Sequence, residues 1–325
     1  MLKLHFINVA DGDSILVEAL SGPRPFRLLV DTGLSRVEPV PGSLRGSCAG
    51  YLKRLGIRHI DVLVVTHLHL DHFGGIGELL RQASVDRVYT GYVPPRQDRR
   101  LPLRPTAQKT IQGQIQCLNL WCETVARLEQ TGCQIHTVTH DQVLTPTDRL
   151  RVELLAPNKA VQAIQTQVWD RLLDGQAVPE DLEYWASKAR NPGSMRLRLQ
   201  YAGRRIELAG DCYGAMWDWG DLKPCDILKV PHHGDCKAVT EELVRKLRPR
   251  HAVISCAAEY IPRKDRPSAR TAELLTAQGA QLWFTDAFSA PWHAAPRQWP
   301  AAVFSIQEDG TILTPNAPTE SGRLT

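Results

Sequence analysis

Residues 60–75 read IDVLVVTHLHLDHFGG, an apolar run that passes directly into three histidines and an aspartate. The run 60–65 has the length of a strand that is buried on both faces, as strands inside α/β sheets are. It ends at Thr66, where the side chains that can bind a metal begin. The stretch therefore predicts an α/β protein with a functional site at the end of a buried strand.

Three histidines and a carboxylate within six positions form a dense set of nitrogen and oxygen ligands for a cation such as zinc. Because side chains alternate along an extended segment, His67 and His69 point the same way. The turn that follows presents Asp71 and His72 to a second point nearby. This spacing suits two metal ions and disfavours the alternative, a polar surface loop.

Strand and helix patterns alternate along the chain in two halves, about 1–150 and 151–325. Two such halves predict two sheets packed face to face with helices outside, within one domain of residues 1–325. A helical segment at about 158–190 interrupts the strands and is interpreted as an insertion. Strands are expected at 2–8, 14–19, 26–30, 60–65, 86–90, 149–155, 194–201, 203–209, 226–230, 252–255 and 281–285, helices at 43–55, 75–83, 106–130, 239–248 and 267–278, and a hairpin at 301–306 and 311–313.

The insertion carries apolar residues at helical spacing, so one of its faces must be buried. We expect it to be a lid or a docking element for a protein partner, outside both the core and the metal site. Simple packing on the neighbouring sheet is the more common alternative. The apolar residues are Val161, Ile164, Val168, Leu172 and Leu173, together with Trp169 and Trp185.

Further ligand-type residues follow later strands. Asp211 ends one expected strand, His232 and His233 end another, and Asp31 ends the strand at 26–30. Each is weak evidence alone. A Gly-Asp pair is more often a turn, and neighbouring histidines are often one buried and one solvated residue. For Asp31, a turn or cap residue is the less common alternative.

The run His67-x-His69-x-Asp71-His72, with Asp31-Thr-Gly before it and Gly210-Asp211 after it, resembles the metallo-β-lactamase fold superfamily. More narrowly, four strings resemble the hydrolase domain of ComEC-type DNA-uptake proteins and their free-standing relatives. The resemblance covers about residues 2–286. The strings are FINVADGDS (6–14), NPGS (191–194), LAGD (208–211) and KVPHHG (229–234).

This resemblance implies an αβ/βα four-layer sandwich with two divalent ions, zinc or manganese, in a cleft between the sheets. His67 and His69 then hold one metal, Asp71 and His72 hold the other, Asp211 bridges them, and Asp31 holds the histidine loop from behind. One histidine of the His-His pair closes the first metal, and the other is a candidate to protonate the leaving group. The sequence does not decide between them; His232 is assigned as the ligand and His233 as the catalytic residue.

Two positions depart from the pattern of this family. A His-Pro step whose histidine completes the second metal is expected, but the chain has Arg266-Pro267. The second metal therefore lacks a ligand, takes Asp265 instead, or binds weakly. The serine expected after His-His-Gly is replaced by Asp235-Cys236. Asp235 is an extra ligand, a base or, more commonly, a loop acid, and Cys236 is a zinc ligand or, as we favour, a buried thiol.

The function expected from these features is a metal-dependent hydrolase, most plausibly a phosphodiesterase or nuclease. A metal-bound hydroxide is expected to attack, and Asp71 to orient it. Two alternatives stay open: hydrolysis of a small ester, lactone or phosphoryl-choline-type substrate, and a degenerate domain that binds nucleic acid or a partner without turnover, motivated by Arg266. The arginine-rich loop 94–105 favours a polyanion or is simply solvated.

Composition adds few constraints. The chain has 39 Lys and Arg against 35 Asp and Glu, an excess that permits a phosphate-bearing substrate without requiring one. The N-terminus lacks signal-peptide features, and the most apolar stretch is far shorter than the ~20 residues of a membrane span. We therefore expect a cytoplasmic protein without membrane contact. The eight cysteines form no CxxC pair and are interpreted as mostly buried thiols.

Overall fold

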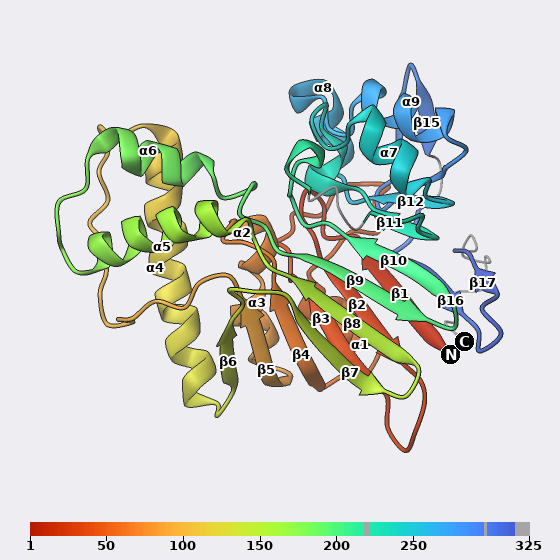
Figure 1. Ribbon diagram of the computed structural model, residues 1–325, viewed down its shortest axis with the longest axis horizontal. Helices are drawn as coiled ribbons and strands as arrows, with labels where there is room; N and C mark the ends of the chain where they lie inside the picture. Colours follow the sequence, from red (N-terminus) through yellow and green to blue (C-terminus); the bar gives the residue numbers. More distant parts are fainter. Residues whose placement is uncertain (218–221, 296–297, 316–325) are drawn as a thin grey trace.

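The computed structural model describes residues 1–217, 222–295 and 298–315, and two large β-sheets dominate it (Figure 1). The first sheet contains, in spatial order, β17 (Ile312–Leu313), β16 (Ala301–Ile306), β1 (Leu2–Ile7), β2 (Ile15–Ala19), β3 (Phe26–Val30), β4 (His59–Val65), β5 (Ser84–Thr90) and β6 (Gln134–Thr137). Strands β1, β2 and β3 form an antiparallel meander, and the expected C-terminal hairpin is confirmed as β16–β17.

The second sheet has an antiparallel half and a parallel half. Its strands, in spatial order, are β13 (Gln281–Phe284), β12 (His251–Ile254), β11 (Ile227–Lys229), β10 (Arg204–Leu208), β9 (Arg196–Tyr201), β8 (Leu150–Leu155) and β7 (Gln142–Thr147). Strands β10 to β13 run parallel, so their carboxyl ends meet at one edge of the sheet. A separate small hairpin, which the sequence did not predict, joins β14 (Phe288–Ala290) and β15 (His293–Ala295).

The helices are shorter than the sequence patterns indicated. The helix expected at 43–55 begins only at Cys48, because the Ser47 hydroxyl caps it by accepting a hydrogen bond from the amide of Gly50 (3.1 Å). The helices are α1 (Cys48–Arg54), α2 (Leu70–Phe73), α3 (Ile76–Leu79), α4 (Lys109–Gln130), α5 (Lys159–Leu173), α6 (Glu180–Lys188), α7 (Glu241–Leu247), α8 (Ile261–Lys264) and α9 (Ala269–Ala277), with 3₁₀ turns η1 (Gly214–Met216), η2 (Pro231–Gly234) and η3 (Ala258–Tyr260).

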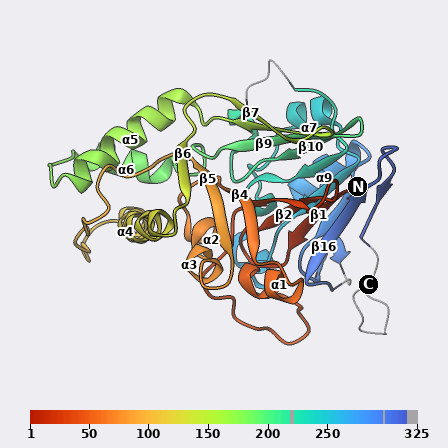
Figure 2. The ribbon, with the colours of Figure 1, turned by 90° about the horizontal axis from the view of Figure 1, so that it is seen from below.

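Three apolar cores separate four layers of structure. The first core lies between the first sheet and helices α1, α3 and α4, and the second lies between the two sheets. The third lies between the second sheet and helices α7 and α9. Figure 2 shows the two sheets stacked, with α1, α2 and α3 on the outer side of the first sheet. The expected αβ/βα four-layer sandwich is therefore confirmed.

Strand β4 explains why residues 60–65 are continuously apolar. Leu63 and Val65 belong to the core on the helix side of the first sheet, whereas Val62 and Val64 belong to the core between the sheets. Neighbours β3 and β5 pair with it in parallel on both edges. A strand buried in this way is rigid, and it therefore fixes the starting point of the histidine loop that follows it.

The two sheets do not follow the two expected halves of the chain. Strand β7, in the first half, already pairs with β8 in the second sheet, and β16, near the C-terminus, pairs with β1 in the first sheet. Because β16 pairs with β1, Phe304 of β16 joins the apolar core between the two sheets. The last residues of the expected domain, 316–325, lie outside the described residues.

The insertion 158–190 belongs to the core, so the expectation that it lies outside the core is wrong. Helix α6 packs against both α4 and α5 at one end of the molecule (Figures 1 and 2). Val168, Trp169 and Leu173 are buried in the same core as Trp121 of α4. The indole Nε1 of Trp169 donates to Oε1 of Gln114 at 2.9 Å. The helical spacing predicted a buried face, and residues of α4 and α6 together with Tyr92 help to cover it.

None of the helices within the described residues combines the length and the apolar character that a membrane span requires.

The two tryptophans of the insertion provide a test of this packing. Trp169 is 4% exposed and Trp185 is 41% exposed. Trp169→Ala is expected to lower the free energy of unfolding by about 3–5 kcal/mol, because it removes a large buried ring. The matched variant Trp185→Ala is expected to change it by no more than about 0.5 kcal/mol. Urea denaturation measures both, and equal effects would contradict the packing.

Candidate metal centre

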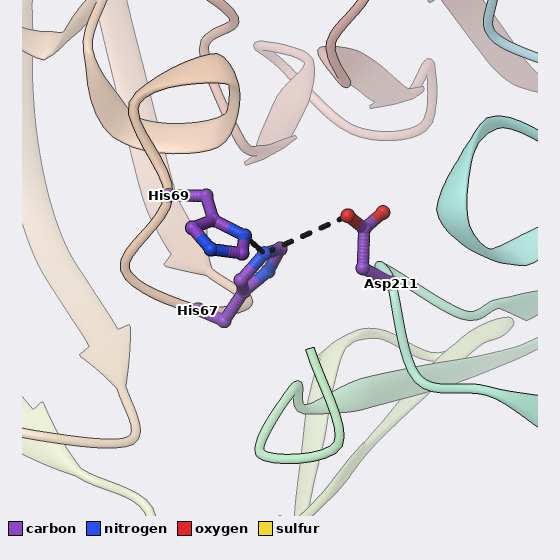
Figure 3. Close-up of side chains that lie close together, drawn as sticks. All are labelled: His67, His69 and Asp211. Atoms are coloured by element: carbon purple, nitrogen blue, oxygen red, sulfur yellow. Dashed lines mark hydrogen bonds and ion pairs between the residues drawn. The ribbon is translucent and has the colours of Figure 1, made fainter. Parts of the chain in front are cut away.

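The first group of ligand-type side chains is His67, His69 and Asp211 (Figure 3). His67 and His69 follow β4, and Asp211 follows β10 from the opposite sheet. Nε2 of His67 lies 2.8 Å from Nδ1 of His69 and 3.7 Å from Oδ2 of Asp211. One ligand atom from each side chain therefore lies within reach of a common point.

The second group is Asp71, His72 and His233. Asp71 and His72 lie on α2, and His233 lies on the 3₁₀ turn η2 that follows β11. Nε2 of His233 is 3.6 Å from Oδ2 of Asp71. Asp211 also reaches this group, since its Oδ1 lies 3.4 Å from Nε2 of His72 and 3.7 Å from Nε2 of His233.

Buried polar atoms without partners are one reason that these residues suit divalent metal ions. Nε2 of His72, Nε2 of His233 and Oδ1 of Asp211 are buried and have no hydrogen-bond partner among the described residues. A buried polar atom without a partner is costly. Imidazole nitrogens and carboxylate oxygens are also the donors that zinc and similar ions prefer. The donor set therefore fits a metal.

Asp31 supports the histidine loop from behind. Its carboxylate accepts hydrogen bonds from the backbone amide of Thr66 (2.8 Å), from the Thr66 hydroxyl (2.7 Å) and from Nδ1 of His72 (2.7 Å). A carboxylate bonded to one ring nitrogen orients a histidine so that the other nitrogen faces a metal. The arrangement therefore leaves Nε2 of His72 aimed at Asp211.

The backbone at this site is strained. Asp31, His232 and His233 have positive φ angles of 58°, 44° and 54°, a region that non-glycine residues rarely occupy. Such strain persists only where the surrounding structure holds it, and it is concentrated at functional sites. Here it turns the chain sharply at the ends of two strands, one from each sheet, and brings His233 to Asp71.

The charges of the site differ between its two groups. Burial is the main reason that the pKa of His69 falls to about 3, and burial with neighbouring histidines holds the pKa of His67 well below its usual value. Burial also opposes a charge on His72, but Asp211 and Asp31 outweigh it and raise the pKa of His72 well above its usual value. His67 and His69 of the first group are therefore neutral at pH 7, whereas His72 of the second group holds a proton that a cation would have to replace.

The two neighbouring histidines have different surroundings. His233 is fully buried and belongs to the second ligand group. Within the described residues, His232 belongs to none of the candidate groups. Its Nδ1 instead pairs with Oδ2 of Asp235 at 2.5 Å, and its Nε2 is 4.0 Å from Asp211. By geometry His233 lies within a candidate ligand group and His232 does not, whereas the assignment made from the sequence took His232 as the ligand.

The residues that depart from the family pattern lie around the rim. Arg266 lies 3.6 Å from Oδ2 of Asp11 and pairs with that acid. Asp235 is engaged by His232, and Asp265 belongs to no candidate group among the described residues. Cys236 is exposed, so the expectation of a buried thiol there is wrong, whereas the other seven cysteines are buried and free.

Several residues of the site received no role from the sequence. The side chain of Lys229 is fully buried and pairs with Asp13, which lies beside His72 and His233. Arg190 donates to the carbonyl oxygen of Leu68 in the histidine loop at 3.4 Å. A single lysine inside the apolar strand β11 was a visible signal for Lys229. No local pattern distinguished Arg190, whose position depends on how the insertion packs.

The loop 94–105 is attached to the insertion by two ion pairs. Arg96 lies 3.2 Å from Asp174, and Arg104 pairs with Glu183. Arg99 and Arg100 remain exposed. Half of the arginines that favoured a polyanion therefore have a structural partner.

The fold and this donor set define a metal-dependent hydrolase of the metallo-β-lactamase type. The model of the Metallo-beta-lactamase superfamily matches residues 11–258, which is more than half of the chain, and the chain belongs to that superfamily.

The chain is also similar to ComE operon protein 3 of Bacillus subtilis, with 26% identity over 300 residues that cover 87% of this chain and 32% of that protein. It thus spans about a third of the length of this relative, and the match confirms the narrower resemblance. Similar solved structures include the metallo-β-lactamase fold protein YhfI from Bacillus subtilis (9% identity, TM-score 0.47, 94% of this chain and 100% of that chain). Another is Zn²⁺-bound PqqB from Methylobacterium extorquens (10% identity, TM-score 0.44, 87% and 98%).

The role of Asp31 can be tested by metal binding. Asp31→Asn is expected to lower the affinity for zinc by about 10–100-fold, because an amide holds the His72 imidazole less well than a carboxylate. A matched control is Asp286→Asn. Asp286 is also a buried acid after a strand, and it accepts hydrogen bonds from Asn8, Ser43 and Ala258. Competition with a chromophoric chelator measures both variants, and an equal loss in the two would contradict the role of Asp31.

Proposed function

We propose that this chain is a phosphodiesterase that works with two divalent ions, zinc or manganese, and that nucleic acid is its substrate. The observation that carries the proposal is the position of Asp211. Its Oδ2 faces His67 of the first ligand group at 3.7 Å, and its Oδ1 faces His72 of the second group at 3.4 Å. A carboxylate between two groups is suited to bridge two ions. Paired positive centres stabilise the highly anionic transition state of phosphodiester cleavage more than that of a neutral ester.

We assign one ion to each of the two ligand groups. His67, His69 and Asp211 are suited to one ion, and Asp71, His72 and His233, with Asp211 beside them, to the other. When bound, such ions polarise the phosphoryl group and lower the pKa of a coordinated water to about 7. Complete sets of three donors disfavour the alternative of a degenerate domain that binds without turnover.

Two further residues have proposed roles in proton transfer and orientation. Asp71 is only partly buried, and its carboxylate is suited to orient the attacking water. His232 lies at the rim, with 15% of its side chain exposed, and Asp235 holds its Nδ1. We assign to His232 the protonation of the leaving group, since a general acid must reach the substrate and His233 is fully buried.

Nucleic acid is the partner we propose because its phosphates can be bound by exposed arginines. The exposed Arg99 and Arg100 lie on the loop before α4, and each phosphate that they neutralise releases counterions. The loop is tied to the insertion through Arg104 and Glu183. Its position relative to the core is therefore maintained by an ion pair.

The first functional test is the loss of hydrolysis on removal of a ligand. His69→Ala and Asp211→Ala are each expected to lower kcat with bis(4-nitrophenyl) phosphate by about 100-fold or more, because each removes support for the charge of the transition state. The matched control is His136→Ala, since His136 stacks on Tyr89 in the first sheet. Steady-state assays at saturating zinc or manganese measure the effect, and undiminished activity in both ligand variants would overturn the proposed catalytic metal site.

The substrate is tested by a panel. The metal-loaded protein is expected to cleave single-stranded DNA, duplex DNA or RNA in addition to bis(4-nitrophenyl) phosphate. Turnover of 4-nitrophenyl acetate, a lactone or 4-nitrophenyl phosphorylcholine, with every nucleic acid intact, would replace the proposal by the small-substrate alternative. Chelation by EDTA is expected to stop all cleavage, and zinc or manganese to restore it.

Arg266 is tested through the occupancy of the second group. We expect the ion held by Asp71, His72 and His233 to bind more weakly than the first, because Arg266 stands where a further imidazole ligand is expected. Arg266→His is expected to raise the occupancy of this ion at limiting zinc, whereas Arg266→Gln, which removes the charge without adding a ligand, should not raise it to the same extent. Metal analysis after gel filtration measures both. Equal, tight occupancy of both sites in the wild type would contradict the prediction.

A further inference from the structure

The single lysine of β11 points into the space between the two sheets. Lys229 lies on the same face of the strand as Ile227, which belongs to the core between the sheets, and its side chain is fully buried. The ammonium contacts the carboxylate of Asp13 and lies 3.4 Å from the carbonyl oxygen of Gly210. A buried ion pair of this kind is often no more stable than apolar side chains of the same volume. Its presence therefore calls for a role beyond packing.

The carboxylate of Asp13 uses only one of its oxygens for the lysine. The other, Oδ1, is buried and has no hydrogen-bond partner among the described residues, and the same is true of Nδ1 of His233. These two atoms lie 3.9 Å apart. A buried acceptor and a buried donor that both lack partners thus face each other beside the second ligand group.

His72 shows the arrangement in which such a nitrogen and carboxylate form a hydrogen bond. Nδ1 of His72 donates to Asp31 at 2.7 Å, and its Nε2 faces Asp211. His233 repeats this arrangement, with Nδ1 toward Asp13 and Nε2 toward Asp71. A histidine that binds a metal through one ring nitrogen generally donates from the other to a carboxylate.

We infer that Asp13, held in place by Lys229, is the positioning carboxylate of His233, as Asp31 is that of His72. The inference rests on the proposed function, since it takes His233 as a ligand. Lys229 has a second effect. Asp13, His72 and Asp211 are close enough to form a metal group of their own, and the ammonium occupies the Asp13 oxygen that lies nearest to His72. Lys229 therefore keeps Asp13 as a support for a ligand and prevents it from becoming a ligand.

Two backbone hydrogen bonds hold Asp13 in this position. The amide of Asp13 donates to the carbonyl oxygen of Asp71 at 3.1 Å, and the carbonyl oxygen of Asp13 accepts from the amide of Gly33 at 2.8 Å. A Cβ atom on the preceding Gly12 would overlap the carbonyl oxygen of Asp71, so this close approach requires glycine. The loop that carries Asp13 is thus fastened to the loop that carries Asp71.

The experiment compares zinc affinity and stability in three variants. Asp13→Asn is expected to weaken the binding of one of the two ions by about 10–100-fold and to leave the other unchanged. The double variant Asp13→Asn/Lys229→Met removes the lysine charge that the single variant leaves unpaired, so it should fold and keep the same metal defect. The matched control is Glu207→Gln, which breaks another buried ion pair, that of Glu207 with Arg198, on β9 and β10. Chelator competition with metal analysis gives the affinities, and urea denaturation of the metal-free proteins gives the stabilities.

A selective loss of one ion in both Asp13 variants, with wild-type zinc affinity in Glu207→Gln, supports the inference. Wild-type affinity for both ions in the double variant would overturn it and would leave Asp13 and Lys229 as a structural ion pair. That result would not affect the proposed function, which depends on His69 and Asp211. A wild-type protein that binds no zinc or manganese would overturn the proposed function and this inference together.

Discussion

A buried group of carboxylates and imidazoles is the constraint on which the rest of this structure depends. Asp13, Asp31 and Asp211 are almost completely buried, together with His67, His72 and His233. Charges removed from water are costly unless each has a partner of opposite charge or a hydrogen bond. Here Lys229 forms an ion pair with Asp13, and Thr66 and His72 donate hydrogen bonds to Asp31. Among the atoms of this group that have no partner within the described residues are Nε2 of His72, Nε2 of His233 and Oδ1 of Asp211, which face the proposed metal ions.

The four layers provide the rigidity that this group requires. His67 and Asp71 come from the first sheet, and Asp211 and His233 come from the second, so neither sheet could build the site alone. The apolar core between the sheets sets their separation. The ion pair of Asp13 with Lys229 also crosses from one sheet to the other, close to the ligands. Apolar packing and ion pairs therefore both hold the loops that carry the ligands. The strained backbone of η2 is consistent with such a constraint, because strain persists only where the surroundings maintain it.

The difference in charge between the two ligand groups has a consequence for metal loading. His67 and His69 are neutral and can bind a cation without losing a proton. The carboxylates around His72 and His233 raise the pKa of both histidines against the effect of burial, so a cation must displace protons there. Arg266 near Asp11 adds another positive charge on the same side.

The sequence by itself determined the fold class, the buried strand at 60–65 and most strand-end residues, because period, apolar run length and ligand spacing are local properties. The tertiary structure decided the rest. Nothing local distinguishes His232 from His233, since their separation depends on two successive positive φ angles that are held by surrounding contacts. The pairing of Asp13 with Lys229 joins residues that lie far apart in the chain, and the burial of Trp169 depends on α4. Such long-range contacts leave little periodicity to detect, because their energy depends on which elements meet and not on the order of residues within each one.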